Sequence, residues 1–171
     1  MNIVLTGFMA SGKSTVARHI SECSDYKFID TDEMIVEREG RSINDIFAKD
    51  GEEYFRRVEH EIICGLSKLD NKVISTGGGV VLNPDNMDEL RKNGIIFNLD
   101  PDFSVIKERV ERAAATRPLM KNQSIEDIEK RFDDRKPFYD NCDYKIHITM
   151  QSEPEITAGK ILEIINEKKE A

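Results

Sequence analysis

The sequence predicts a three-layer α/β protein, in which helices flank a parallel β-sheet. Short β-branched runs alternate with longer segments whose apolar residues recur at helical spacing, which is typical of repeated βαβ units. The first short run, residues 3–6, is apolar on both faces, as expected of a buried central strand. A length of 171 residues suits one compact domain. We therefore expect a single domain, residues 1–171, with excursions from its core.

Five strands are predicted along the chain. They are residues 3–6, 26–29, 73–75, 95–99 and 144–148. The helix after the first strand begins near Lys13, because Val16, Ile20 and Cys23 follow at helical spacing. A closing amphipathic helix is expected over residues 156–167.

Sequence signals for helix starts predict further helices. Ser42 and Asp45 resemble a capping box, and a longer amphipathic helix is expected from about Glu52 to Leu69. Asn83-Pro84 and Asp100-Pro101 each combine a favoured N-cap with a proline suited to the first helical position. We therefore expect a helix to begin at each of these two prolines.

Composition excludes several classes of function. The chain has 25 Lys+Arg and 33 Asp+Glu, a net charge of −8, whereas non-specific nucleic-acid binding needs a basic field. No apolar run approaches the ~18 residues of a membrane span, and the N-terminus lacks the basic region of a signal peptide. The three cysteines are widely spaced without a CxxC pair, which favours a reducing compartment over disulfides or zinc. We expect a cytoplasmic protein without nucleic-acid or membrane partners.

Residues 7–14, GFMASGKS, fit the phosphate-loop pattern G-x-x-x-x-G-K-[ST] between a buried strand and a helix. The glycines let backbone N–H groups converge on phosphate oxygens, and the helix N-terminus favours their negative charge. Lys13 should reach the β- and γ-phosphates, and the Ser14 hydroxyl should bind Mg²⁺. The motif predicts binding of a nucleoside triphosphate.

Other sequence features distinguish among the phosphate-loop classes. The base-reading N-K-x-D pattern of GTPases is missing, because Asn71-Lys72-Val73-Ile74 lacks the acid and precedes a strand. The third strand ends in Ser75-Thr76 without the acid usual in motor-type ATPases. The available carboxylate is Asp30, at the end of the second strand. A small chain with these features and a late arginine-bearing lid favours a small-metabolite kinase.

Asp30-Thr31-Asp32 stands where a strand opens into the crevice that binds ligands in open α/β sheets. Asp30 would face the water shell of the metal. Asp32 would accept hydrogen bonds from a polyol and take a hydroxyl proton as the acceptor attacks. The alternative is that Asp32 only caps the next helix.

Two further patterns suggest an acceptor site. Arg56 and Glu59 share a helix face, and a guanidinium held by a carboxylate suits bidentate binding of a substrate carboxylate. A solvated surface ion pair is the alternative. Gly77-Gly78-Gly79 follows the third strand and would let backbone N–H groups approach a ligand, unless the run is a plain loop.

The least patterned stretch is about residues 112–123, a candidate lid that contains Arg117-Pro118-Leu119. Arg135 opens the segment R-K-P-F-Y, which follows a helix that Ser124 and Asp127 should start. A lid arginine can neutralise charge on a transferring phosphoryl group after the lid closes. Taken singly, either arginine could be solvated surface.

In this order, GFMASGKST, D-T-D, F-R-x-x-E, the triple glycine, R-P-L and R-x-P-x-Y resemble the shikimate kinase family over essentially the whole chain. The resemblance implies a five-stranded parallel sheet in the order 2-3-1-4-5, a substrate-binding excursion at about residues 32–60 and a lid at about 112–123. It implies transfer of the γ-phosphoryl of ATP to the 3-hydroxyl of shikimate, with Mg²⁺ as cofactor, by a protein that we expect to be a monomer.

The resemblance also implies roles residue by residue. The ATP site would comprise Gly7, Ala10, Ser11, Gly12, Lys13, Ser14, Thr15, Arg112 and Arg117. The shikimate site would comprise Asp32, Arg56, Gly77, Gly78, Gly79 and Arg135. The catalytic residues would be Lys13, Asp32 and Arg117, and the metal would be held by Ser14 and, through water, Asp30. Ala10, where many members have glycine, and the alanine-rich lid entry at residues 113–115 depart from the family pattern.

Two other functions remain open from the sequence. A related kinase could act on gluconate or a nucleoside monophosphate, although the combined acceptor motifs disfavour both. A non-catalytic module could instead use ATP only to open and close the lid, but such a sensor would have no need for a carboxylate-binding arginine.

Overall fold

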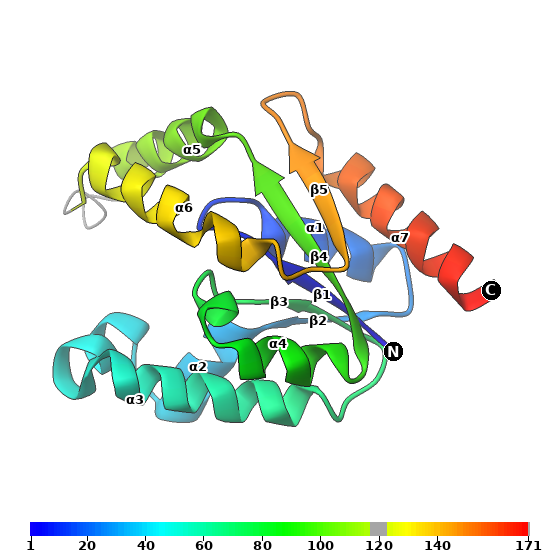
Figure 1. Ribbon diagram of the computed structural model, residues 1–171, viewed down its shortest axis with the longest axis horizontal. Coiled ribbons are helices and arrows are strands. Elements are labelled where there is room, and N and C mark those ends of the chain that lie inside the picture. The colour runs from blue at the N-terminus through cyan, green and yellow to red at the C-terminus, as the bar shows by residue number, and fades with distance from the viewer. Residues whose placement is uncertain (117–122, 171) are drawn as a thin grey trace.

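The computed structural model describes residues 1–116 and 123–170 and contains a five-stranded sheet in the order β2-β3-β1-β4-β5 (Figure 1). The strands are β1 (Asn2–Thr6), β2 (Lys27–Asp30), β3 (Lys72–Ser75), β4 (Gly94–Pro101) and β5 (Tyr144–Ile148). Every neighbouring pair is parallel. The predicted sheet and strand order are confirmed.

Helices cover both faces of this sheet. They are α1 (Lys13–Glu22), α2 (Thr31–Glu39), α3 (Ile43–Leu66), α4 (Pro84–Arg91), α5 (Phe103–Thr116), α6 (Ile125–Tyr139) and α7 (Pro154–Glu170), with a short 3-10 turn, η1 (Val80–Leu82). Side chains of β1 alternate between two apolar clusters: Val4 packs with residues of α3, α4 and α6, whereas Ile3 and Leu5 pack with α1 and α7. This double burial explains why the β1 sequence is continuously apolar.

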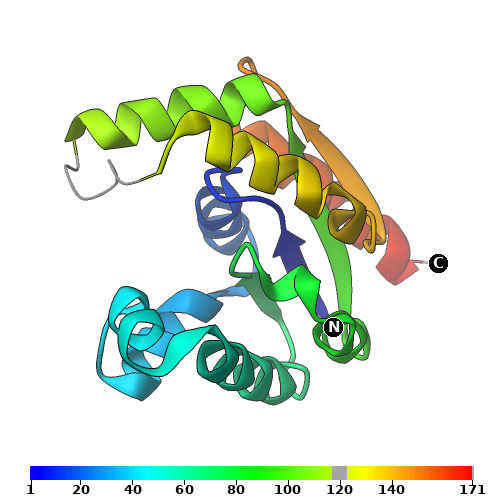
Figure 2. The same cartoon turned by 60° about the vertical axis from the view of Figure 1, so that its left-hand side comes forward.

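Two segments project from the sheet toward the same side of the molecule (Figure 2). One comprises α2 and the first part of α3, and the other is the antiparallel pair α5 and α6. Inside α3, Gly51 has φ 82° and ψ 175°, so two helical stretches meet there at a kink. The sequence predicts this break, because a helix start is indicated at Ser42 and a separate, longer helix is expected from about Glu52.

Helix caps test the predictions from local sequence. Asn83 caps α4 by accepting from the N–H of Asp85, and Pro84 is the first helical residue, as predicted. The Asp100-Pro101 prediction is wrong: both residues belong to β4, opposite His147 and Ile148 of β5, and α5 begins only at Phe103. Pairing with β5 holds Asp100-Pro101 in an extended conformation, which overrides its local preference for a helix start.

The segment expected to be a lid divides into two parts. Residues 112–116 continue α5 as regular helix, so this part is not unpatterned as predicted. The rest of the candidate lid up to residue 122, including Arg117, lies outside the described residues. None of the helices in the described ranges is both long and apolar enough to cross a membrane.

Candidate active site

The phosphate loop connects β1 to α1, and three of its residues, Gly7, Ala10 and Gly12, have a positive φ that favours glycine. Gly7 has φ 150°, and a Cβ there would lie 2.7 Å from the carbonyl oxygen of Leu99. Gly12 caps α1 in a left-handed conformation, φ 95°. Ala10 also has a left-handed backbone, φ 60°, which explains physically why glycine would be easier at this position.

Lys13 is buried beneath the loop. Its Nζ donates to the carbonyl oxygens of Gly7 at 2.7 Å and Phe8 at 3.0 Å, and to the Ser11 hydroxyl at 3.3 Å. Burial lowers the pKa of Lys13 to about 8, and the nearby carboxylates of Asp32 and Asp30 partly oppose the shift. The loop therefore surrounds a cation that phosphate oxygens could bind.

Oxygen donors meet beside this lysine. The Ser14 hydroxyl donates to Oδ2 of Asp30 at 2.9 Å and lies 3.1 Å from the Ser75 hydroxyl. Hydroxyl and carboxylate oxygens are the ligands that Mg²⁺ prefers, so Ser14 and Asp30 fit the predicted metal. The other oxygen of Asp30 accepts from the N–H groups of Asp32 and Glu33 and caps α2. The cap is therefore Asp30, not Asp32 as the alternative proposed.

Asp32 lies in the first turn of α2 and is free of the capping role. Burial is the largest cause that raises its pKa, the charge of Asp30 adds to the shift, and Lys13 and Arg56 oppose it. A Cβ on Gly77 would lie 2.7 Å from Oδ1 of Asp32, so glycine at this position makes room for the carboxylate. A raised pKa in a cleft is a common property of functional carboxyl groups.

A pocket of about 330 Å³ joins the phosphate loop to these acids. Its lining comprises Met9, Ala10, Gly12, Lys13, Ser14, Thr15, Asp30, Asp32, Ser75, Thr76 and Gly78. The exposed Thr15 thus faces the same space as the predicted metal and acceptor residues.

Arg56 is held by a buried carboxylate. Its Nη1 donates to Oε2 of Glu59 at 2.8 Å, and Glu59 is 1% exposed. The other oxygen of Glu59, Oε1, is buried and has no hydrogen-bond partner among the described residues. Burial raises the pKa of Glu59, and Arg56 is the main opposing charge.

A Cβ on Gly79 would lie 2.6 Å from Nη1 of Arg56, so glycine at this position leaves room for the guanidinium. The pair is therefore part of a packed site rather than a solvated surface pair.

Helix α6 brings Arg135 and Tyr139 to the same glycine run. The Tyr139 hydroxyl donates to the carbonyl oxygen of Gly78 at 2.6 Å, and burial raises the pKa of Tyr139 to about 12. A Cβ on Gly78 would be 3.5 Å from the N of Met9 and 3.8 Å from Nη1 of Arg135. Gly78 therefore lies between the phosphate loop and Arg135, with ordinary space around it.

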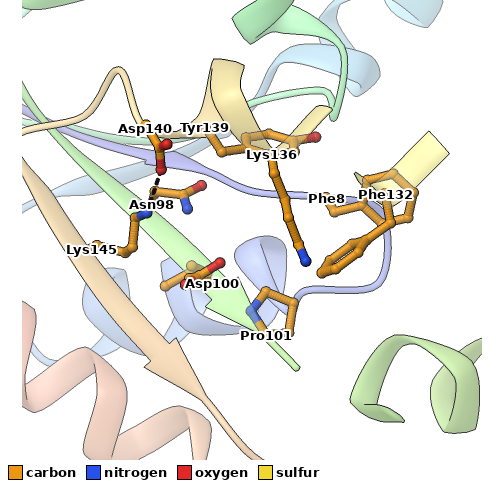
Figure 3. A pocket seen from close by; sticks show the side chains of 10 residues that line it. Phe8, Asn98, Asp100, Pro101, Phe132, Lys136, Tyr139, Asp140 and Lys145 are labelled. Atoms are coloured by element: carbon orange, nitrogen blue, oxygen red, sulfur yellow. Dashed lines mark hydrogen bonds and ion pairs between the residues drawn. The ribbon is translucent and has the colours of Figure 1, made fainter. Parts of the chain in front are cut away.

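A second pocket of about 200 Å³ lies between α6 and the end of β4 (Figure 3). Phe8 and Phe132 form an aromatic wall, and the Asp140–Lys145 ion pair lies near Asn98. This pocket shares no lining residue with the phosphate-loop pocket. Phe8 and Tyr139 line this second pocket and also contact Lys13 and Gly78 of the candidate active site.

An arginine that the sequence analysis did not single out contacts the phosphate loop. Arg112 is 73% exposed and pairs with Glu108. Arg109, one turn earlier on α5, instead donates to the carbonyl oxygen of Ala10 at 2.9 Å. The two arginines are three residues apart on one helix, so sequence spacing alone did not distinguish them.

A family model described as shikimate kinase matches residues 9–166. The chain belongs to the shikimate kinase family. A shikimate kinase of Caldicellulosiruptor bescii is 46% identical over 95% of this chain and 94% of its own length. Two solved structures share the family fold. A shikimate kinase from Acinetobacter baumannii in complex with shikimate has a TM-score of 0.87 and 32% identity, covering 98% of this chain and 94% of that one. The Aquifex aeolicus shikimate kinase has a TM-score of 0.81 and 35% identity, covering 99% and 98%.

Proposed function

We propose that this site transfers the γ-phosphoryl of ATP to the 3-hydroxyl of shikimate, giving shikimate 3-phosphate and ADP. The chain is an ATP-dependent kinase of this family, and one observation connects the reaction to the geometry. Gly78 lies between Met9 of the phosphate loop and Arg135 of α6, so the acceptor residues adjoin the phosphate loop. Phosphoryl transfer requires mainly that the two substrates be held together and that charge be stabilised.

The phosphate half of the site is assigned to the loop and α1. Lys13 would exchange its contacts with the loop carbonyls for β- and γ-phosphate oxygens, and the N-terminus of α1 would add its partial positive charge. Ser14, with Asp30 through water, would hold Mg²⁺. When bound, the ion would neutralise charge on the phosphates. Arg112 and Arg117 retain their proposed roles in binding ATP, Arg117 as the lid arginine, and Arg109 is added as a contact of the loop.

The acceptor half is assigned to α2, α3 and α6. Arg56 and Arg135 would bind the carboxylate of shikimate, with Glu59 fixing the orientation of Arg56. Asp32 would accept the proton of the attacking hydroxyl, because its raised pKa makes it a stronger base than an ordinary aspartate. The glycine run, Gly77–Gly79, would contact the ring hydroxyls through its backbone.

Domain organisation, assembly and location are part of the same proposal. Residues about 32–60 would form the acceptor-binding excursion, and residues about 112–123 would form the lid, of a single domain spanning 1–171. We further propose a monomer in the cytoplasm, a location that the three free cysteines favour.

The decisive assay is acceptor-dependent ADP release from MgATP, with shikimate compared against gluconate, CMP and UMP. ADP release is expected with shikimate and not with gluconate, CMP or UMP. Turnover with gluconate or a nucleotide instead would assign a different acceptor, and nucleotide binding without turnover on any acceptor would favour a sensor.

Asp32→Asn should lower kcat by about 10²-fold or more, because the amide cannot accept the hydroxyl proton. Steady-state kinetics with shikimate and ATP would measure this change. Glu33→Gln is the matched control, since Glu33 is the next residue and its side chain makes an exposed contact with Arg18. An unchanged kcat with a raised KM would make Asp32 a binding residue only.

A further inference from the structure

Three polar side chains form a hydrogen-bonded chain between α3 and α4, outside both pockets. Asn86 of α4 is 1% exposed, and its Nδ2 donates to the carbonyl oxygen of Val80 at 3.2 Å. Its Oδ1 lies 2.7 Å from Nδ1 of His60. On the other side of the ring, Nε2 of His60 lies 3.5 Å from Sγ of Cys64, one turn further along α3.

The contacts of Asn86 determine which nitrogen of His60 carries the proton. Because Nδ2 of Asn86 is committed to the Val80 carbonyl, the oxygen Oδ1 faces His60, and this oxygen can only accept. Nδ1 of the neutral ring must therefore donate. The lone pair of Nε2 is left facing the Cys64 thiol.

We infer that Cys64 is a modification site that reacts with low-molecular-weight disulfides, with His60 as its general base and Asn86 as the residue that orients His60. A nucleophile, a base and a third group that holds the base form the arrangement by which proteins activate weak nucleophiles. Cys64 is half-buried, so its sulfur is not sealed in the core.

The reaction is a thiol–disulfide exchange. As the Cys64 sulfur attacks, its proton moves to Nε2 of His60, and a new S–S bond forms to one sulfur of the disulfide. The S–S bond of the reagent breaks, and the departing thiolate takes the proton back from His60. The reagent is the oxidant, because one of its sulfurs leaves as a thiol.

Charged groups of α4 face this cluster but offset each other. Glu89 accepts from the Ser67 hydroxyl at 3.1 Å and pairs with Lys92. His60 contributes to the lowered pKa of Glu89, and Cys64 contributes to the raised pKa of Lys92, although the Glu89–Lys92 hydrogen bond is the largest cause of both shifts. Because Glu89 and Lys92 pair with each other, His60 is the basic group whose lone pair faces the Cys64 thiol.

The chain contains its own comparison. Cys23 follows His19 at the same spacing, four residues apart on a helix, and is more exposed than Cys64. However, the ring nitrogens of His19 face carboxylates, Glu22 at 3.6 Å and Glu155 at 3.4 Å. His19 therefore faces these two carboxylates rather than the Cys23 thiol.

The test is to incubate the folded full chain at pH 7 with 2-hydroxyethyl disulfide, a neutral probe, and to measure the mixed disulfide at each cysteine by peptide mass spectrometry. Cys64 should react faster than the more exposed Cys23. His60→Gln should slow Cys64 by about tenfold or more and leave Cys23 unchanged. The matched variant His19→Gln should change neither rate.

A Cys64 rate no greater than that of Cys23 in the unmodified sequence would overturn the inference, as would a Cys64 rate that His60→Gln leaves unchanged.

Discussion

Arg56 and Arg57 are neighbours on α3, yet their surroundings differ completely. Arg56 is held by the buried Glu59, whereas Arg57 is exposed and stacks on the Tyr54 ring at 5.1 Å. Arg56→Ala should raise KM for shikimate about 10- to 100-fold, because a hydrogen-bonded charge contributes about 1.5–3 kcal/mol. KM for ATP should change far less, and initial-rate kinetics with each substrate varied would separate the two.

The matched control is Arg57→Ala, which removes the same charge one residue away and should leave both KM values near those of the unmodified chain. Equal effects of Arg56→Ala on shikimate and ATP would contradict the carboxylate role. Equal effects of the two variants would instead assign the change to the overall charge of the helix.

Lys13 gives a prediction about pH. Burial lowers its pKa to about 8, so in the free protein its ammonium is complete below that pH and is lost above it. Binding of ADP should therefore weaken above pH 8, by up to about tenfold per pH unit, because the phosphates must then recruit a proton to Lys13. Titration calorimetry in buffers of different ionisation enthalpy would measure both the affinity and the proton uptake.

Lys13→Arg tests the cause of this dependence, since a guanidinium stays charged throughout the range. Any ADP affinity that this variant keeps should not change between pH 7 and 9.5. If the unmodified chain bound ADP equally well at pH 7 and 9.5, the buried lysine would not be the group that titrates.

At the level of an element, Gly51 determines the shape of the acceptor-binding excursion. Its φ of 82° with ψ of 175° is open almost only to glycine, so Gly51→Ala should lower the free energy of unfolding by about 1–3 kcal/mol. Apart from its chain neighbours, no atom of the described residues lies within 4 Å of the added Cβ, so the cost would arise from the backbone and not from a clash. Urea denaturation would measure it.

Gly159 in α7 is the control for this glycine. A Cβ there also meets nothing within 4 Å, but the backbone is helical, so Gly159→Ala should stabilise the chain by about 0.5–1 kcal/mol. A loss of stability at both positions would mean that the backbone at Gly51 is not the cause.

At the level of the whole molecule, a net charge of −8 coexists with a proposed site for two anions. The described cations of the proposed site, Lys13, Arg56, Arg109 and Arg135, come from distant parts of the sequence and belong to α1, α3, α5 and α6. Most of the acidic residues lie on the exposed surface, where they favour solubility. The overall charge therefore argues against nucleic-acid binding but says nothing about the sign of the site.

Because the site exists only in the folded chain, its ligands should stabilise the fold. Each of ADP and shikimate, at about 100 times its Kd, should add about 2.7 kcal/mol to the free energy of unfolding. Differential scanning calorimetry would detect this as a higher Tm. Arg56→Ala should keep the shift with ADP and lose the shift at the same shikimate concentration, and a full shikimate shift in this variant would contradict the assigned acceptor site.

The sequence by itself determined the features that depend on near neighbours. The phosphate loop, five strands, the Asn83 cap and the break before Glu52 could all be predicted, because loops, caps and spacing are decided by residues a few positions apart. Family motifs added the strand order, which local pattern does not contain.

Only the tertiary structure decided the features that depend on residues distant in sequence. Pairing with β5 keeps Asp100-Pro101 in a strand, and the fold brings Arg109 of α5 to the carbonyl oxygen of Ala10 in the phosphate loop. Asp32 and Arg56 lie where a Cβ on Gly77 or Gly79 would be, whereas a Cβ on Gly78 would make ordinary contacts with Met9 and Arg135. Burial and charge at each of these positions arise from segments that meet only in the folded chain, so they were not visible in the sequence.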